Sequence, residues 1–330
     1  MSGKALRDLN ALPLSERESE SLNKAVLIKP LVGNSNGDTE KVPAKNSTLV
    51  ASSLAKEAEV ASTVSDVGSI EVEYVESENL NDVDDKERVL QTLLAGLDSK
   101  DWVLVCEALN NVRRLSIFHK ESMHDMLDQV VSLIVKSMKN PRSALCKTAI
   151  MSSEDIFKAY GDLIVDLFDP LLVQLLLKAS QDKRFVCEAA ERALVAMTNW
   201  VSPTLLIPKL QPYLKHKNPR LRAKTSMCFS RSVQRLGTEG IQAFGIDKLI
   251  QIAASQLSDQ LPESREAARS LLFELQSVYE KSITSASVTE PEPAKLSSWE
   301  LFCQSKLSPL SAQAVLRVTG VTREGLVFSS

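Results

Sequence analysis

Histidine and cysteine are the residue types in this chain best suited to metal binding or nucleophilic catalysis, and their spacing supports neither. The histidines are His119, His124 and His216, and none is spaced with cysteines or carboxylates as in a zinc site. The five cysteines never form a C-x-x-C pair. The chain also lacks G-x-G-x-x-G, Walker, H-E-x-x-H and G-x-S-x-G motifs. We therefore expect a non-enzymatic protein with no catalytic residue, no metal and no cofactor.

The cysteines and the hydropathy pattern predict where the protein is found. Cys106 and Cys187 stand at equivalent positions of two similar segments, VCEAL (105–109) and VCEAA (186–190), so core packing accounts for both. An odd number of cysteines inside apolar patterns is typical of a reduced, intracellular protein. The first residues carry charges and do not resemble a signal peptide. The most apolar stretch, residues 163–177, contains two aspartates and does not resemble a membrane span. We expect a cytoplasmic protein.

Positive charge is concentrated in five short segments. They hold nine Lys/Arg and four Asp/Glu in total: SKDW (99–102), KNPR (139–142), QDKR (181–184), KHKNPR (215–220) and DQLPESR (259–265). The first of them also contains Trp102, an aromatic residue suited to anchoring an interface. This composition favours binding of an acidic protein surface. Two alternatives are that charged turns are only solvated and that Trp102 packs against its own helix.

These segments separate helices that recur with a period near 40 residues. Five similar openings begin at residues 105, 144, 186, 221 and 264, and each is the start of a second amphipathic helix. This period is typical of HEAT-type repeats, in which stacked helical hairpins share one core. Prolines at or near first helical positions support the boundaries, and Pro208 and Pro212 should kink or shorten a helix over 203–214. The predicted hairpins are 88–116, 120–160, 163–199, 203–235 and 246–281.

The predicted fold is therefore all-α, an α-solenoid of about five HEAT-type hairpins over residues 86–281. Residues 1–85 are acidic and rich in serine, and we expect them to be disordered. Residues 282–297 have the composition of a linker, and 298–330 form a tail with possible short helices. In a solenoid, turns within hairpins lie along one edge and turns between hairpins along the other. The basic segments all belong to the first edge.

Composition narrows the function further. Aromatic residues make up only 5% of the 330 residues, too few for a large β-sandwich or for a nucleic-acid surface that stacks bases. The 39 basic residues are balanced by 42 acidic ones, so the chain does not resemble a protein that coats nucleic acid. We therefore do not expect it to bind RNA or DNA.

The five hairpins, Asp101-Trp102 in the first turn and the basic later turns resemble a TOG domain of the CLASP and crescerin type. The stretch LLAGLDSKDWVLVCEALNNVRRL (93–115) is similar to the opening of that domain, and the chain resembles plant ARM-repeat superfamily proteins. The resemblance implies binding of tubulin or microtubules and association with the cytoskeleton. It assigns an apolar contact to Trp102 and charged contacts, turn by turn, to Lys139 with Arg142, Lys183 with Arg184, Lys217 with Arg220, and Arg265.

One departure and one alternative remain open. TOG domains commonly have six hairpins, whereas the sequence predicts five, and only the segment 298–318 is a candidate for a sixth. The alternative function is a HEAT-repeat scaffold or adaptor that binds a protein other than tubulin. Such a scaffold would depend on its helix faces, whereas tubulin binding would depend on turn residues such as Trp102 and Lys183. The sequence does not specify an oligomeric state.

Overall fold

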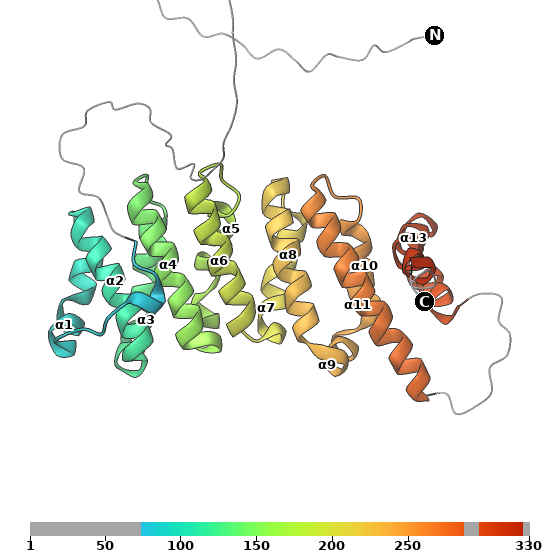
Figure 1. The fold of residues 1–330 in the computed structure, drawn as a ribbon, viewed down its shortest axis with the longest axis horizontal. Helices are drawn as coiled ribbons and strands as arrows, with labels where there is room; N and C mark the ends of the chain where they lie inside the picture. The colour runs from blue at the N-terminus through green and yellow to red at the C-terminus, as the bar shows by residue number, and fades with distance from the viewer. Residues whose placement is uncertain (1–73, 287–296, 326–330) are drawn as a thin grey trace, which may run out of the picture. The chain divides into compact units, whose positions relative to one another are not determined.

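A computed structural model describes residues 74–286 and 297–325, and within these ranges the protein is built from helices without a strand (Figure 1). The predicted all-α class is therefore confirmed. The described residues all belong to one compact unit. The disorder expected for residues 1–73 concerns a segment outside the described residues, as does most of the expected linker. None of the described helices has the length and hydrophobicity that crossing a bilayer would require.

Antiparallel helical pairs follow one another along the chain. Each pair joins a first helix to a second one through a short turn. The pairs are α1 (Lys86–Leu97) with α2 (Trp102–Phe118), α3 (Leu127–Met138) with α4 (Ser143–Tyr160), α5 (Asp169–Lys178) with α6 (Arg184–Trp200), α7 (Pro203–Leu210) with α8 (Pro219–Arg235), α10 (Ile246–Gln256) with α11 (Pro262–Ala286), and α12 (Ser298–Lys306) with α13 (Pro309–Gly325). The five predicted hairpins are thus present.

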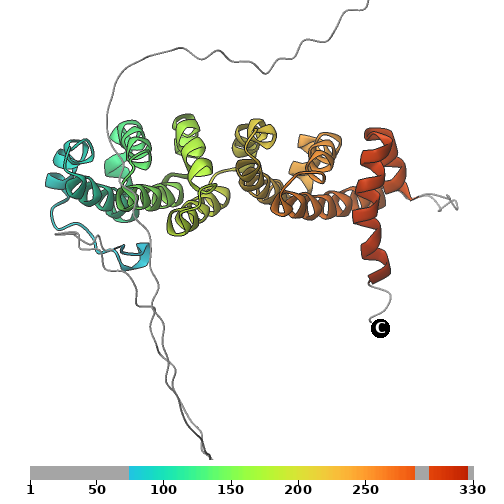
Figure 2. The ribbon, with the colours of Figure 1, turned by 90° about the horizontal axis from the view of Figure 1, so that it is seen from above.

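The first helices of the five predicted pairs lie in one layer and the second helices in the other (Figure 2). Small side chains let the second helices approach one another closely. The Ser152 hydroxyl of α4 donates a buried hydrogen bond of 3.1 Å to the Leu109 carbonyl of α2, and Ala149 and Ala190 are fully buried. One contiguous apolar core runs between the layers, as expected for stacked repeats whose single hairpins cannot bury their apolar faces alone.

The first two connections between pairs are longer than the sequence suggests, because they contain the 3₁₀ helices η2 (Lys120–Met126) and η3 (Gly161–Leu167). The fourth connection contains the short helix α9 (Gly237–Phe244). Within the fourth pair, α7 ends at Leu210 and is followed by η4 (Gln211–Lys215). Pro208 and Pro212 lack the N–H groups that would continue the α-helical ladder. The predicted shortening of this helix is therefore confirmed.

The C-terminal helices form a sixth pair that extends the core, where the sequence pattern had predicted about five. Trp299, Cys303 and Val315 are buried, and the Trp299 ring packs 5.4 Å from the Tyr279 ring of α11. The start of α12 is fixed by a capping box in which Ser297 and Glu300 satisfy each other's backbone N–H groups. The helices expected in the tail are present at 298–325, and the segment named as a candidate for a sixth hairpin packs on the surface that α10 and α11 leave open.

Residues 74–85 correct the prediction that all of 1–85 is disordered. They include the 3₁₀ helix η1 (Ser77–Asn79) and pack on the second helices. Arg113 of α2 and Asp155 of α4, each 1% exposed, form an ion pair of 2.8 Å. Arg113 also donates to the Val75 carbonyl at 2.8 Å, and the Ser77 hydroxyl donates to Asp155 at 2.7 Å. Buried charges require such partners, and the composition of 74–85 gives no sign of them.

Candidate functional site

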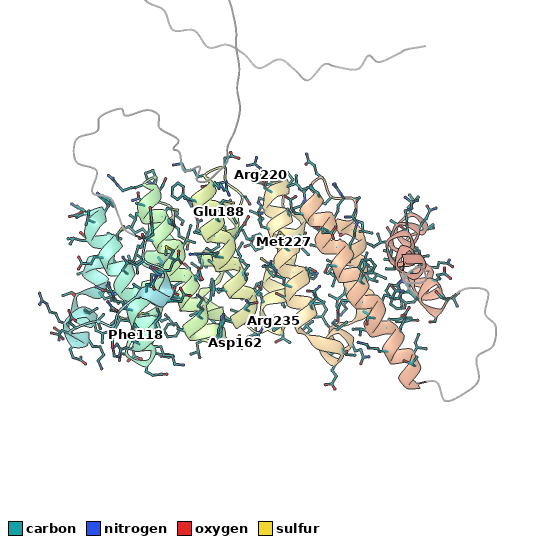
Figure 3. The ribbon with its side chains drawn as sticks, viewed as in Figure 1. Phe118, Asp162, Glu188, Arg220, Met227 and Arg235 are labelled. Carbon is teal, nitrogen blue, oxygen red and sulfur yellow. The ribbon has the colours of Figure 1, made fainter. Side chains whose placement is uncertain are left out.

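The turns within pairs lie on one edge of the layers and the connections between pairs on the other. Figure 3 shows Arg220 at the first edge and Phe118, Asp162 and Arg235 at the second. We call the first the intra-hairpin edge, made of residues 98–102, 139–142, 179–185, 215–222 and 257–265. The second is the inter-hairpin edge, made of residues 117–126, 160–169, 199–205 and 236–247. All eight predicted binding residues lie on the intra-hairpin edge.

Trp102 is the first helical residue of α2 and lies half-buried at the first turn. Asp101 caps the helix by accepting a hydrogen bond from the Val103 N–H at 2.9 Å. The indole packs against the core, and the Arg142 guanidinium carbon of the second turn lies 4.4 Å from its ring centroid. This cation–π contact joins two of the predicted binding residues. Trp102 therefore packs against its own domain and is also presented at the surface.

Contacts between successive turns continue along the whole edge. The Lys183 ammonium of the third turn donates to the Ser143 hydroxyl of the second at 2.9 Å. Arg220 of the fourth turn pairs with Asp182 of the third, and Arg222 pairs with Asp259 of the fifth at 2.7 Å. The turns consequently form one continuous surface in which each is positioned by its neighbour.

Four of the predicted cations on this surface have no carboxylate partner among residues 74–286 and 297–325. Lys139 and Lys217 are exposed and have no ion pair there, Arg142 stacks on Trp102, and Lys183 contacts a neutral hydroxyl. Because these charges are not neutralised within the domain, they are available for an acidic ligand.

The remaining predicted cations are already engaged. Arg184 pairs with Glu188 one helical turn away at 2.7 Å, and this hydrogen bond raises the pKa of its guanidinium. Arg220 is held by Asp182. Arg265 donates to the carbonyls of residues 259 and 260 at 2.8 and 2.9 Å, so it closes the fifth turn. The structure brings all eight predicted residues to one edge. Some of them present unpaired charge, and others hold the geometry of a turn.

Arg222 organises the fourth and fifth turns and was missed by the sequence interpretation. It donates to the carbonyls of His216 and Lys217 at 2.9 and 3.3 Å and to Asp259. Burial alone would raise the pKa of Asp259, but hydrogen bonds from Arg222 and from the Leu261 N–H hold it below its usual range. Arg222 lies inside α8 rather than in a turn, so the charge pattern of the turns did not point to it.

Phe185 is a second residue that the sequence interpretation missed. It follows the third turn directly and is 43% exposed, although phenylalanine is usually buried. The Lys147 ammonium lies 5.9 Å from its ring centroid. An aromatic residue directly after a run of cations was the signal that could have found it, because the same combination marked Trp102.

A groove of about 420 Å³ lies between the third and fourth turns and contains Cys187, Glu188, Arg220 and Lys224 among its lining residues. The Cys187 thiol donates to the Ala179 carbonyl at 3.1 Å, as the Cys146 thiol of the preceding repeat does to Met138 at 3.3 Å. Burial, and for Cys187 also the Glu191 carboxylate, raises the pKa of the thiol. Protonated thiols that close turns are structural groups rather than nucleophiles.

The chemistry of the edge is that of a protein interface. No group of three or more metal-binding side chains occurs among the described residues. The histidines stay apart: His119 contacts Asp82 at 2.8 Å, and the Nδ1 of His216 accepts from the Asn218 N–H at 3.1 Å. A half-buried aromatic ring beside unpaired cations is suited to an acidic surface with an apolar contact point.

Two sequence relatives carry the name TOG array regulator of axonemal microtubules protein 1. The mouse protein is 27% identical over 205 residues, which cover 61% of this chain and 12% of the relative. The human protein is 31% identical over 124 residues, which cover 38% of this chain and 7% of the relative. The chain thus spans only a small part of the length of these curated relatives.

Solved structures support the fold. The TOG domain of C. elegans Zyg9 superposes with a TM-score of 0.51 at 16% identity, covering 76% of this chain and 91% of that domain. A structure from work on microtubule plus end tracking by XMAP215, CLIP-170 and EB1 gives 0.51 at 17% identity, covering 73% and 94%. At these identities the similarity is one of fold.

The family match covers more than half of the chain. The CLASP N-terminal family matches residues 114–288, from the second half of α2 to the end of the fifth pair. The predicted resemblance to TOG-type HEAT repeats is thus confirmed by sequence and by fold. The chain belongs to the CLASP N-terminal family and folds as a TOG-type α-solenoid.

Proposed function

We propose that the protein binds tubulin or microtubules through its intra-hairpin edge and acts by binding, without catalysis. The proposal is supported by the family, by relatives named as regulators of axonemal microtubules, and by the chemistry of the edge. It places the protein with the cytoskeleton in the cytoplasm.

The observation that carries the proposal is the Trp102–Arg142 stack, continued by cations without carboxylate partners within the described residues. The Arg142 guanidinium carbon lies 4.4 Å from the indole ring centroid. Lys139 lies on the same turn as Arg142, Lys183 on the third turn and Lys217 on the fourth. Stacking holds the guanidinium in place and leaves its N–H groups free to donate to a carboxylate. The apolar ring supplies an anchor, and the lysines supply charge-assisted hydrogen bonds.

Charges exposed on a surface are screened by salt, so this mode of binding has an electrostatic signature. Steering by a cationic edge accelerates encounter with an acidic partner at low salt and loses effect as the Debye length shortens. The apolar anchor is much less sensitive to salt. We therefore expect an affinity that falls with salt but does not vanish.

The test is binding of the full chain to tubulin dimers and to stabilised microtubules at low and moderate salt. The double variant Trp102→Ala with Lys183→Ala should lose at least about tenfold in affinity, because it removes the anchor and an unpaired cation. The matched control is Arg231→Ala, which removes an exposed cation from a helix face of α8. Thermal unfolding of both variants establishes that each is folded.

Two outcomes would contradict the proposal. If Arg231→Ala weakens binding as much as the double variant, the ligand contacts the helix face, as a scaffold would. If the folded wild-type chain binds neither form of tubulin, the edge serves another acidic partner, and the scaffold function takes precedence.

A further inference from the structure

The inter-hairpin edge exposes apolar side chains that the solenoid core does not use. Among the described residues, five of the eleven exposed large hydrophobic side chains lie there. They are Ile117 (42% exposed), Phe118 (43%), Leu163 (65%), Trp200 (56%) and Leu205 (42%). Single exposed apolar residues are ordinary, but a row of them along one edge marks an interaction surface.

Direct contacts between successive connections make this row continuous. The Tyr160 hydroxyl donates to the Lys120 carbonyl at 2.8 Å, which joins the first connection to the second. Asp162 accepts from the Ser202 N–H at 2.6 Å, which joins the second to the third. A Cβ on Gly161 would lie only 2.8 Å from the Trp200 carbonyl oxygen, so the backbones touch. Arg235 donates to the Val201 carbonyl at 2.9 Å and attaches the fourth.

The edge is acidic, in contrast to the intra-hairpin edge. Its four segments contain one lysine, Lys120, and seven Asp/Glu. Two cations of neighbouring helices reach the edge: Arg235 donates to the Val201 carbonyl, and Lys209 pairs with Asp169. Asp125 is fully exposed, and its one ionic contact among the described residues is His124 at 3.8 Å. Asp166 is exposed and has no cationic partner among the described residues. An acidic partner, which the intra-hairpin edge is suited to bind, is therefore repelled by the inter-hairpin edge.

The spacing of the apolar residues fits a helix. Neighbouring packed helices are about 8–10 Å apart, so anchors contributed by successive pairs recur at about that distance. Along an α-helix, side chains seven residues apart on one face are separated by about 10 Å. The apolar stripe of a helix lying along the edge would thus contact Phe118, Leu163 and Trp200 successively, one contact for every two helical turns.

We propose that the inter-hairpin edge is a second docking surface, for an amphipathic helix of another protein whose apolar stripe is flanked by lysines and arginines. Trp200 and Phe118 anchor the stripe, and Asp125 and Asp166 pair with its basic flanks. Because the two edges lie on opposite sides of the layers (Figure 3), both are accessible at once. The domain then joins an acidic partner on one edge to a basic helical partner on the other.

The test uses a labelled synthetic amphipathic peptide of about 20 residues, with leucines on one face and lysines elsewhere. A matched peptide carries glutamates in place of the lysines. Fluorescence anisotropy uses the full chain carrying Trp102→Ala and Lys183→Ala, so that the intra-hairpin edge does not offer the acidic peptide a second site. It should show salt-sensitive binding of the lysine peptide and little binding of the glutamate peptide. Trp200→Ser with Phe118→Ser should weaken binding at least about tenfold. Leu104→Ser, which removes a 48% exposed side chain from the first turn of α2, is the matched control and should leave binding unchanged.

The charge variant Asp125→Lys with Asp166→Lys gives an independent reading, since both carboxylates are exposed and their loss should not affect folding. It should weaken binding of the lysine peptide and strengthen binding of the glutamate peptide. Equal binding of the two peptides, or binding of the lysine peptide that neither double variant changes, would overturn the proposal. Sedimentation showing a wild-type dimer that Trp200→Ser dissociates would also overturn it, because the row would then be covered by a second copy of the chain.

Discussion

The two edges are built from the same helical pairs but by different turn chemistry. The intra-hairpin turns are short, and caps such as Asp101 and Asn218 close them through side-chain hydrogen bonds. Three of the four connections between the predicted pairs contain a 3₁₀ or short α-helix, whereas the third consists only of residues 201–202. All three positive-φ glycines of the described residues lie on this edge: Gly161, Gly237 and Gly245. Short capped turns need no core of their own, so their remaining side chains are free to carry charge.

The longer connections must pack to be stable, and this explains their composition. Met123, Ile164 and Ile241 are fully buried beneath them. A segment that supplies its own buried residues from a 3₁₀ or short α-helix also leaves neighbouring apolar residues outside, such as Leu163 at 65% exposure. The connections that contain a short helix thus add packed apolar segments to the inter-hairpin edge, whereas the capped turns of the other edge leave charged side chains exposed.

The largest expected effect is a loss of stability on substitution of Gly161, the glycine at which two inter-hairpin connections come into contact. Gly161 has φ +48°, and an added Cβ would meet the Trp200 carbonyl oxygen at 2.8 Å. Gly161→Ala should lower the free energy of unfolding by about 2–3 kcal/mol, measured by urea denaturation. Gly320→Ala is the control, because nothing lies within 4 Å of its added Cβ, and helix propensity should make it neutral or slightly stabilising. An equal loss in both variants would contradict this account of the edge.

The next effect separates the edges by charge. Lys139→Glu with Lys217→Glu reverses two cations that have no carboxylate partner among the described residues, and tubulin affinity should fall by about tenfold or more. Asp125→Lys with Asp166→Lys makes a comparable change on the inter-hairpin edge and should alter that affinity by less than about threefold. Co-sedimentation or anisotropy at one fixed salt concentration measures both. A similar loss in both variants would mean that net charge, not the edge, governs binding.

Much of this arrangement could be predicted from local sequence signals. The prolines at 219 and 262 lie within one helical turn of the helix starts that they specify, and the period near 40 residues indicates the repeat itself. They therefore predicted five hairpins and assigned the cationic segments to one edge. The aromatic and cationic residues of that edge were found for the same reason, since a short turn exposes what it contains.

The sequence interpretation failed where the deciding partner is distant in sequence. Residues 74–85 pack because Arg113 and Asp155 need partners, and Ser77 is 78 residues from Asp155. Asp182 engages Arg220 from 38 residues away, so counting cations could not reveal which were free. The sixth pair depends on an apolar surface left by α10 and α11, so the sequence of 298–318 made it a candidate without deciding it.

A smaller effect tests Asp259, a carboxylate that the intra-hairpin edge uses as structure. The pKa of Asp259 is lowered in the folded protein, so its ionised form stabilises the fold above the unfolded pKa of about 4. That contribution is lost as the pH falls through the folded pKa. Asp259→Asn should cost about 1 kcal/mol of unfolding free energy at neutral pH and much less near pH 3. A cost that is independent of pH would mean that the carboxylate's charge plays no part.

The smallest expected effect distinguishes neighbouring cations on one turn. Lys183 donates to the Ser143 hydroxyl and has no carboxylate partner among the described residues, whereas Arg184 is held by Glu188. Removing Arg184 together with Glu188 deletes a pair whose charges balance, so the field at the ligand changes little. Arg184→Ala with Glu188→Ala should alter tubulin affinity by less than about twofold, and Lys183→Ala by more, when both are titrated under the same conditions. The reverse order would show that the ligand competes for Arg184 with Glu188, and that internal pairing does not decide which cations of this edge bind.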